Sequence, residues 1–192
     1  MNFIHVLVFT FILTLTTSCG IQSIPTALNE VDASWAEVLN QYKRRTDLIP
    51  NLVSTVQGYA AHEKETLEAV MQARAEASKV EIDPTKLNAE TMQKFQNAQG
   101  SLSSALGRLM VVVEKYPELK ANENFLALQS QLEGTENRIT IARRRYIETV
   151  KEFNNLVTVF PTSITNSLMF KHEKKPQFTI SEAEQAAPKV QF

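Results

Sequence analysis

The 192-residue sequence predicts an all-α fold, an elongated antiparallel bundle of three to four long helices with the first one kinked at Pro50. Apolar residues recur in steps of three and four over three long segments, as one buried face of an α-helix requires. Only 5 glycines are present, too few for a turn-rich β fold or for glycine-rich phosphate loops. Short breaks at 80–84 and 116–122 would make neighbouring helices antiparallel.

Residues 1–18 are predicted to form a signal peptide. The segment from Phe3 to Leu15 is almost entirely apolar, and small polar residues follow it up to Ser18. Its length of about 13 residues suits the apolar core of a signal peptide, whereas a transmembrane helix needs about 20.

The segment from Leu15 to Cys19 resembles the lipobox of bacterial lipoproteins, in which the cysteine is lipidated and becomes the first residue of the mature chain. We therefore expect cleavage before Cys19, a lipid (palmitate) on this cysteine, and a linker over 19–26. The alternative is a short uncleaved anchor. Either arrangement tethers the domain to the cell membrane or the outer membrane, and a lipoprotein domain would face away from the cytoplasm.

The first helical pattern extends from Val31 to Ala77, with Trp35 and Tyr42 on its apolar stripe. Pro50 interrupts this pattern. Because proline within a helix removes a hydrogen bond and clashes with the preceding turn, we expect a kink there or two abutting helices.

Two further helical patterns follow, and both end at a proline. Asp83 and Pro84 predict an N-cap and a first helical position for a helix that ends before Pro117. The third pattern predicts a helix from about 122 to Phe160. The bundle domain would thus span 27–170.

A tail follows the bundle domain over 171–192. It has the composition of a loop, yet four apolar residues recur within it. It is therefore either a tail without fixed structure or a strap that packs back through these residues, which are Phe178, Ile180, Val190 and Phe192.

The sequence contains no recognisable catalytic or metal-binding pattern. Neither His62 nor His172 completes the Glu-x-x-His motif of di-metal helix bundles, and nucleophile-elbow and phosphate-loop motifs are missing. Twenty Lys and Arg against 21 Asp and Glu leave no basic excess for nucleic acid. We therefore predict that the protein is not an enzyme, uses no metal or cofactor, and does not bind nucleic acid.

Two basic runs and one polar group are the candidate contact residues. The runs could bind anionic lipid head groups or an acidic partner, although the exposed face of any bundle carries charge. They are Lys43, Arg44 and Arg45, and Arg143, Arg144 and Arg145. Arg45, Asp47 and Asn51 near Pro50 could meet the polar residues of 133–138 across the bundle, where they would fix the register or line a small pocket. This second group comprises Asp47, Asn51, Glu136, Asn137 and Arg138.

Three ordered motifs resemble those of the LemA family: QYKRRTDLIPNLV at 41–53, YPELKA at 116–121 and LEGTENRI at 132–139. The resemblance covers about 27–192 and implies an α-helical bundle domain held at a bacterial membrane by its N-terminus. It brings no catalytic residue. Two departures are the lipobox-like segment, where family members usually carry a transmembrane helix, and Ile147, where asparagine is common.

These observations predict a membrane-anchored helical scaffold or adaptor of the bacterial cell envelope that binds other envelope proteins. The alternative is a lipoprotein that binds a small molecule or peptide, with its site near Pro50 and 133–138.

Overall fold

The computed structural model describes residues 3–80, 82–83 and 87–178, with side chains described from Ile21 onward. All regular structure in these residues is helical, which confirms the predicted all-α class. The elements are α1 (Phe3–Gln57), α2 (Lys64–Lys79), α3 (Ala89–Val113), α4 (Pro117–Lys120), α5 (Glu123–Thr158), α6 (Thr162–Thr165) and a π-helical turn, η2 (Asn166–Phe170).

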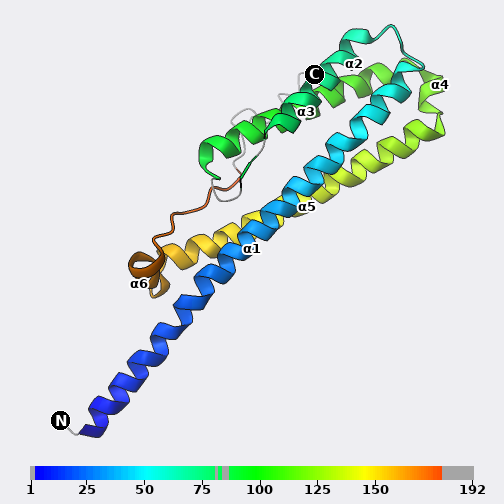
Figure 1. Ribbon diagram of the computed structural model, residues 1–192. Helices are drawn as coiled ribbons and strands as arrows, with labels where there is room; N and C mark the ends of the chain where they lie inside the picture. Colours follow the sequence, from blue (N-terminus) through cyan, green and yellow to red (C-terminus); the bar gives the residue numbers. More distant parts are fainter. Residues whose placement is uncertain (1–2, 81, 84–86, 179–192) are drawn as a thin grey trace, which may run out of the picture.

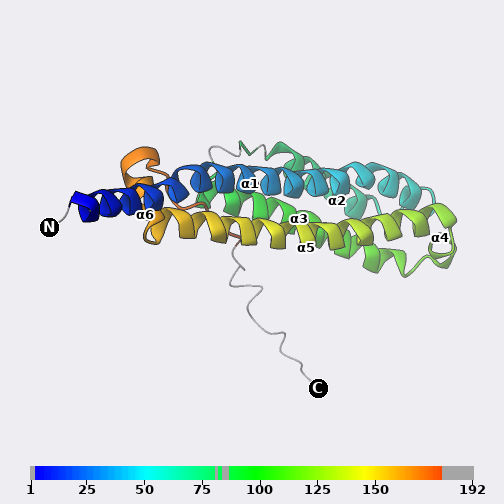
Figure 2. The same ribbon diagram turned by 90° about the horizontal axis from the view of Figure 1, so that it is seen from below.

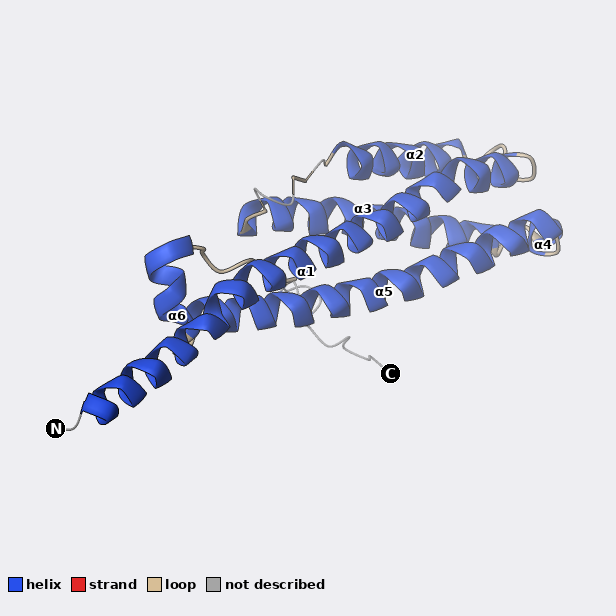
Figure 3. Ribbon diagram, turned by 60° about the horizontal axis from the view of Figure 1, so that its bottom comes forward, coloured by secondary structure: helices blue, strands red, loops and turns tan. Residues whose placement is uncertain are grey.

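The molecule is elongated, and α1 and α5 run side by side in opposite directions along its length (Figures 1 and 2). A second pair, α2 and α3, packs beside the C-terminal half of α1 (Figure 3). The N-terminal part of α1 projects beyond the bundle (Figure 1). Within the described residues, no helix combines the length and apolar character that crossing a bilayer requires.

The core forms two clusters along the bundle. The first is centred on Trp35, whose ring centroid lies 5.5 Å from that of Phe95 on α3 and 5.1 Å from that of Tyr146 on α5. The second lies nearer the α1–α2 turn and includes Ile49, Leu52, Leu102, Leu109 and Phe125. Burial of these large side chains from four helices drives the association of the bundle.

α1 continues through Pro50 as one helix, so a division into two abutting helices at this proline is wrong. Proline has no N–H and therefore leaves the carbonyl of Thr46, four residues earlier, without its helical donor. Arg74 on α2 replaces that donor, since its Nε donates to the Thr46 carbonyl at 2.8 Å. A contact from another helix thus compensates for the proline.

The first helical pattern breaks instead at 58–63, so the expected single run to Ala77 is wrong. Gly58 follows the last residue of α1, and the N–H groups of Ala60 and Glu63 close the turn with backbone hydrogen bonds. The hydroxyl of Tyr116 donates to Glu63 at 3.1 Å and fastens this turn to the start of α4. Low helix propensity at Gly58 and complete burial of Ala60 favour the break here.

α3 begins later than predicted, at Ala89. Asn88 is its N-cap, because the Asn88 side chain accepts from the Thr91 N–H at 2.9 Å and Thr91 Oγ1 accepts from the Asn88 N–H at 3.0 Å. This reciprocal capping box replaces the expected cap at Asp83, while Pro84 lies outside the described residues. α5, capped by Asn122, agrees with the range predicted for the third helix.

After η2 the chain turns back along α5, and 171–178 lies against the bundle. Tyr146 donates its hydroxyl to the Pro176 carbonyl at 2.9 Å, and Asn154 Nδ2 donates to the Lys175 carbonyl at 3.0 Å. The ring of Phe178 lies 5.9 Å from that of Trp35. We call 171–178 the strap; Ile180, Val190 and Phe192 lie outside the described residues.

Candidate functional site

The side chain of Arg45 joins three long helices near the middle of the bundle. Its side chain is 3% exposed, and Nη1 donates to Glu136 Oε2 on α5 and to Ser103 Oγ on α3, both at 3.1 Å. Nη2 donates to Oε1 of Gln99 on α3 at 2.5 Å. Burying a cation is costly unless it is paired and hydrogen-bonded, and these partners satisfy Nη1 and Nη2, whereas Nε is buried without a hydrogen-bond partner among the described residues. Arg45 therefore holds α1, α3 and α5 in register.

Tyr42, one turn before Arg45, completes this buried cluster. The Arg45 guanidinium lies 5.0 Å from the centroid of the Tyr42 ring, within the range of a cation–π contact. Burial raises the pKa of Tyr42 above its usual value, while the charges of Arg143 and Arg45 oppose that shift. The phenol therefore stays neutral at physiological pH.

An open groove of about 530 Å³ lies over this cluster, between α3 and α5. Its wall on α3 consists of uncharged polar and small residues: Gln93, Gln96, Asn97, Gln99, Gly100, Ser101, Ser103 and Ser104. A more apolar hollow of about 290 Å³ continues past Ser103 toward Met110 and Leu132. Both hollows share Arg45, Ser103 and Glu136, so they form one surface that we call the α3–α5 groove.

Two glycines of α3 line this groove and face open space. A Cβ atom added at Gly100 or Gly107 would meet nothing within 4 Å. Glycine in a helix interior costs about 1 kcal/mol relative to alanine. Packing within the described part of the chain therefore gives no reason for these glycines.

The two basic runs do not act as two continuous patches. Arg45 is buried, and Arg143 is half-buried in the wall of the groove, with its guanidinium 4.6 Å from the centroid of the Phe178 ring. The remaining members, Lys43, Arg44, Arg144 and Arg145, are exposed. The structure therefore brings one residue of each run into the groove and leaves the others in solvent.

Of the polar group predicted around Pro50, one residue contacts Arg45 and the others lie apart from it. Glu136 contacts Arg45, whereas Asn137 and Arg138 are exposed on α5. Asp47 lines a separate hollow beside α2, and Asn51 lines a shallow one between α1 and α5.

The contribution of α3 to the groove was not predicted. Gln99 is 5% exposed and occupies a position on the apolar stripe of that helix. A polar residue at a stripe position must find a buried partner, and that was the available signal for the contact with Arg45. Ser103 and the two glycines gave no such signal, because small and polar residues are ordinary on an exposed helix face.

Among the described residues, no group of three or more His, Cys, Asp or Glu side chains is placed to hold a metal ion. The α3–α5 groove instead offers amide and hydroxyl groups along an open surface, with Glu136 and Arg143 as its accessible charges. Such a surface suits the binding of another molecule through hydrogen bonds and close packing.

The fold and the groove define an elongated helical-bundle protein with an open groove between α3 and α5. The chain belongs to the LemA family, whose family model matches residues 34–192. It is 25% identical over 135 residues to Protein LemA of Metamycoplasma hominis, a match that covers 70% of this chain and 58% of that protein.

Magnetosome proteins match a shorter segment. The chain is 34% identical over 64 residues to Magnetosome protein MamQ 1 of Paramagnetospirillum magneticum, which is 33% of this chain and 24% of that protein. The match to Magnetosome protein MamQ of Magnetospirillum gryphiswaldense is 31% identical over the same shares. The chain thus spans little more than half of the mycoplasma protein and about a quarter of each magnetosome protein. None of these names states a reaction.

Proposed function

We propose that this chain is a membrane-tethered helical scaffold of the bacterial cell envelope, without catalytic activity, that binds another envelope protein along the α3–α5 groove. The observation that carries the proposal is the open, largely uncharged surface that runs along two long helices beside a fixed cluster at Arg45. A lipid on Cys19, after removal of 1–18, would supply the tether and place the domain outside the cytoplasm.

The unexplained glycines support a protein partner. At Gly100 and Gly107 the backbone of α3 is open to close approach, and each glycine destabilises the isolated helix. A partner helix or strand that packs directly on this backbone would account for both residues. Arg45 and Glu136, which are in contact with each other, line the same groove as these glycines.

Photocrosslinking in living cells tests this proposal. A photoreactive amino acid at Ser104, in the groove, is expected to form one dominant adduct with an envelope protein, which mass spectrometry then identifies. The same amino acid at exposed Lys94, which does not line the groove, should not form that adduct.

A matched pair of variants separates binding from folding. G100A/G107A should raise the thermal midpoint of the purified chain, because alanine favours the helix, and yet reduce the Ser104 adduct severalfold. An adduct of unchanged yield in G100A/G107A and in a bulkier G100L/G107L chain would contradict binding along the groove.

A second candidate is the binding of a peptide or small molecule in the same groove. The polar lining around Glu136 and Arg143 favours it, because few well-placed polar groups suffice to orient a small ligand. A thermal-shift screen of metabolites and short peptides tests this candidate. A hit that E136Q or R143Q abolishes would support it, and no hit would favour the protein partner.

A further inference from the structure

Exposed apolar side chains gather at one end of the bundle, in the turn that follows α5. Phe160 and Leu168 are 75% and 76% exposed, and three further large apolar side chains around them are also exposed: Val159, Ile164 and Met169. We call residues 159–169 the apolar turn. Exposed apolar patches on soluble surfaces usually mark a contact with a partner or a membrane.

The apolar turn also contains no charge. Residues 153–170 include no Asp, Glu, Lys or Arg, although such residues make up 21% of the sequence. A surface that stays in water has no need to exclude charge over so long a stretch. A surface that enters the interfacial region of a bilayer does, because dehydrating a charged side chain is costly.

Packing beneath the turn holds these side chains outward. Asn166 is buried, and its Nδ2 donates to the carbonyls of Val157 at 3.3 Å and His172 at 3.0 Å. Its Oδ1 accepts from the His172 N–H at 3.0 Å. Phe170, which lies between Asn166 and His172 in the sequence, packs against the core and stacks on His172 with ring centroids 5.7 Å apart. The exposed apolar groups are thus presented by a hydrogen-bonded frame.

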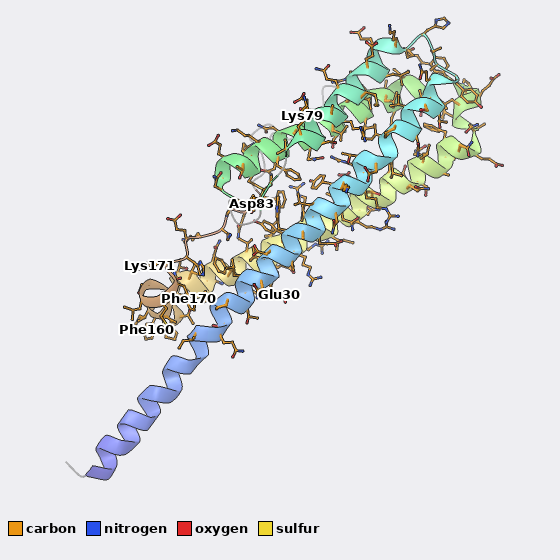
Figure 4. The ribbon with its side chains drawn as sticks, in the orientation of Figure 1. Glu30, Lys79, Asp83, Phe160, Phe170 and Lys171 are labelled. Atoms are coloured by element: carbon orange, nitrogen blue, oxygen red, sulfur yellow. The ribbon has the colours of Figure 1, made fainter. Side chains whose placement is uncertain are left out.

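The apolar turn lies at the end of the bundle from which α1 projects, and α6 contacts α1 there (Figures 1 and 4). Ile24 is fully buried in the same core cluster as Phe170 and Val157. Ile24 lies only five positions after Cys19, which is about 7.5 Å of helix. An anchor at Cys19, or an uncleaved apolar segment before it, would therefore bring this end of the bundle to the bilayer surface.

We propose that the apolar turn inserts into the interfacial region of the lipid bilayer beside the N-terminal tether, and so gives the bundle a second membrane contact. This inference rests on the tether of the proposed function. A single tether leaves a domain free to tilt, whereas two contacts fix its orientation. Lys171 and Lys174, exposed directly after the turn, suit the phosphates of lipid head groups.

Depth-dependent fluorescence quenching tests the insertion. The full chain carries one native cysteine, Cys19, which acylation would block, so L168C can be labelled with an environment-sensitive dye. The matched control is L126C, an exposed apolar position near the start of α5 at the opposite end of the bundle. Both chains are reconstituted into phosphatidylcholine–phosphatidylglycerol vesicles.

The dye at residue 168 is expected to shift to the blue, to be quenched by spin-labelled lipids, and to become severalfold less accessible to aqueous iodide. The dye at residue 126 should stay accessible to iodide. A chain that floats with the vesicles while the dye at 168 remains open to iodide would overturn the insertion and leave the tether intact. Failure to float with the vesicles would instead refute the tether together with the insertion.

Two further controls test whether lipid contact depends on the apolar side chains of the turn and whether a second copy covers them. For this control the dye is attached at I164C. In that chain F160Q/L168Q should abolish quenching by spin-labelled lipids. V111Q/L126Q should not, because Val111 and Leu126 lie away from the turn. Energy transfer between dyes on different chains, measured in detergent, tests for a second copy. If this transfer accompanies the blue shift and depends on protein concentration, a second copy covers the turn, and the proposal is overturned.

Discussion

Arg45 links α1 to α3 and α5 at the centre of the bundle through buried hydrogen bonds. R45M keeps much of the side-chain volume but leaves Oε1 of Gln99 buried without a donor. An unsatisfied buried acceptor costs about 1–3 kcal/mol, so we expect the free energy of unfolding to fall by about 2–3 kcal/mol. Urea denaturation of the full chain in detergent measures this change.

Two matched variants show whether the loss belongs to the buried pair. R45M/Q99M replaces both polar partners, and we expect most of the lost stability to return, since an apolar pair can substitute for a hydrogen-bonded one. R44M, at an exposed neighbour, should change stability by no more than about 0.5 kcal/mol. If R45M/Q99M is as unstable as R45M, the cost arises from the lost contacts of Arg45 with Ser103 and Glu136 instead.

Tyr146 gives the stability of the bundle a dependence on alkaline pH. Burial raises the pKa of its phenol well above the usual value of about 10, with a smaller effect from Asp32. The folded chain therefore holds this proton when the unfolded chain has begun to release it. Stability from this group is complete below about pH 10 and is lost as the pH rises above that value.

Y146F removes this dependence. At pH 7 the variant should lose only the hydrogen bond to Pro176, about 1 kcal/mol. Between pH 9 and 11 its urea midpoint should fall less steeply than that of the wild-type chain. Some slope will remain, because burial also raises the pKa of Tyr42. Equal slopes in the two chains would show that Tyr146 does not hold its proton more tightly in the folded state.

At the scale of the element, α1 tolerates Pro50 because Arg74 supplies the missing donor. R74L should cost about 1–2 kcal/mol in the wild-type chain, since it leaves the Thr46 carbonyl unpaired. P50A should stabilise α1 by roughly 1–3 kcal/mol, because alanine restores the N–H and removes the steric clash. In the P50A background R74L should then cost little, because the restored N–H already donates to the Thr46 carbonyl.

The double-mutant cycle of P50A and R74L, followed by urea denaturation, measures this coupling. R108L, at an exposed arginine of α3, controls for the loss of a charge. Additive effects of P50A and R74L would mean that the bond between Arg74 and Thr46 does not compensate for the proline.

The helices that the sequence predicted well are those whose ends and buried faces depend on local signals. α5 was predictable because its cap and apolar stripe are local signals. The break after α1 was not, because Val56, Ala60 and Leu67 keep the helical spacing across the turn. Pro50 was read as an interruption because its compensating donor comes from another helix, and such a contact leaves no trace in the local pattern.

In the candidate site, too, local features could be predicted from the sequence, whereas contacts between helices could not. The sequence suggested that Arg45 could meet residues 133–138, which include Glu136. The burial of Arg45 and its contacts with α3 were not predicted, because the local pattern does not show which helix packs beside it. On α3, Gln99, polar on an apolar stripe, signalled a buried polar contact in advance. The groove itself depends on the spacing of α3 and α5, which the sequence pattern does not encode.

At the scale of the whole molecule, the proposed contacts lie at different heights above the membrane. The apolar turn packs beside the start of the bundle near Ile24, whereas Arg45 lies 21 residues further along α1, about 30 Å of helix. A partner in the α3–α5 groove would therefore bind well above the bilayer surface. Fixing the tilt of the bundle at the membrane would then set the position of that partner.

The strap runs from the proposed membrane end of the bundle toward the α3–α5 groove. Trp35, the only tryptophan of the sequence, lies against it, so its fluorescence can detect changes in the strap. Phe178 packs its ring against those of Trp35 and Tyr146 and lies beneath the Arg143 guanidinium in the wall of the groove. F178A should expose Trp35, so its fluorescence should shift to the red and its quenching by acrylamide should rise. Loss of these ring contacts should destabilise the chain by about 1–3 kcal/mol.

The change at Phe178 should also reach the groove, because Arg143 loses the ring on which its guanidinium rests. We therefore expect F178A to lower the yield of the Ser104 photoadduct in cells. F160A, which removes an exposed ring away from the strap, should leave the Trp35 emission unchanged in detergent. Unchanged Trp35 emission in F178A would contradict the idea that the strap covers the core. A red shift without loss of the adduct would show that the strap protects the core but does not shape the groove.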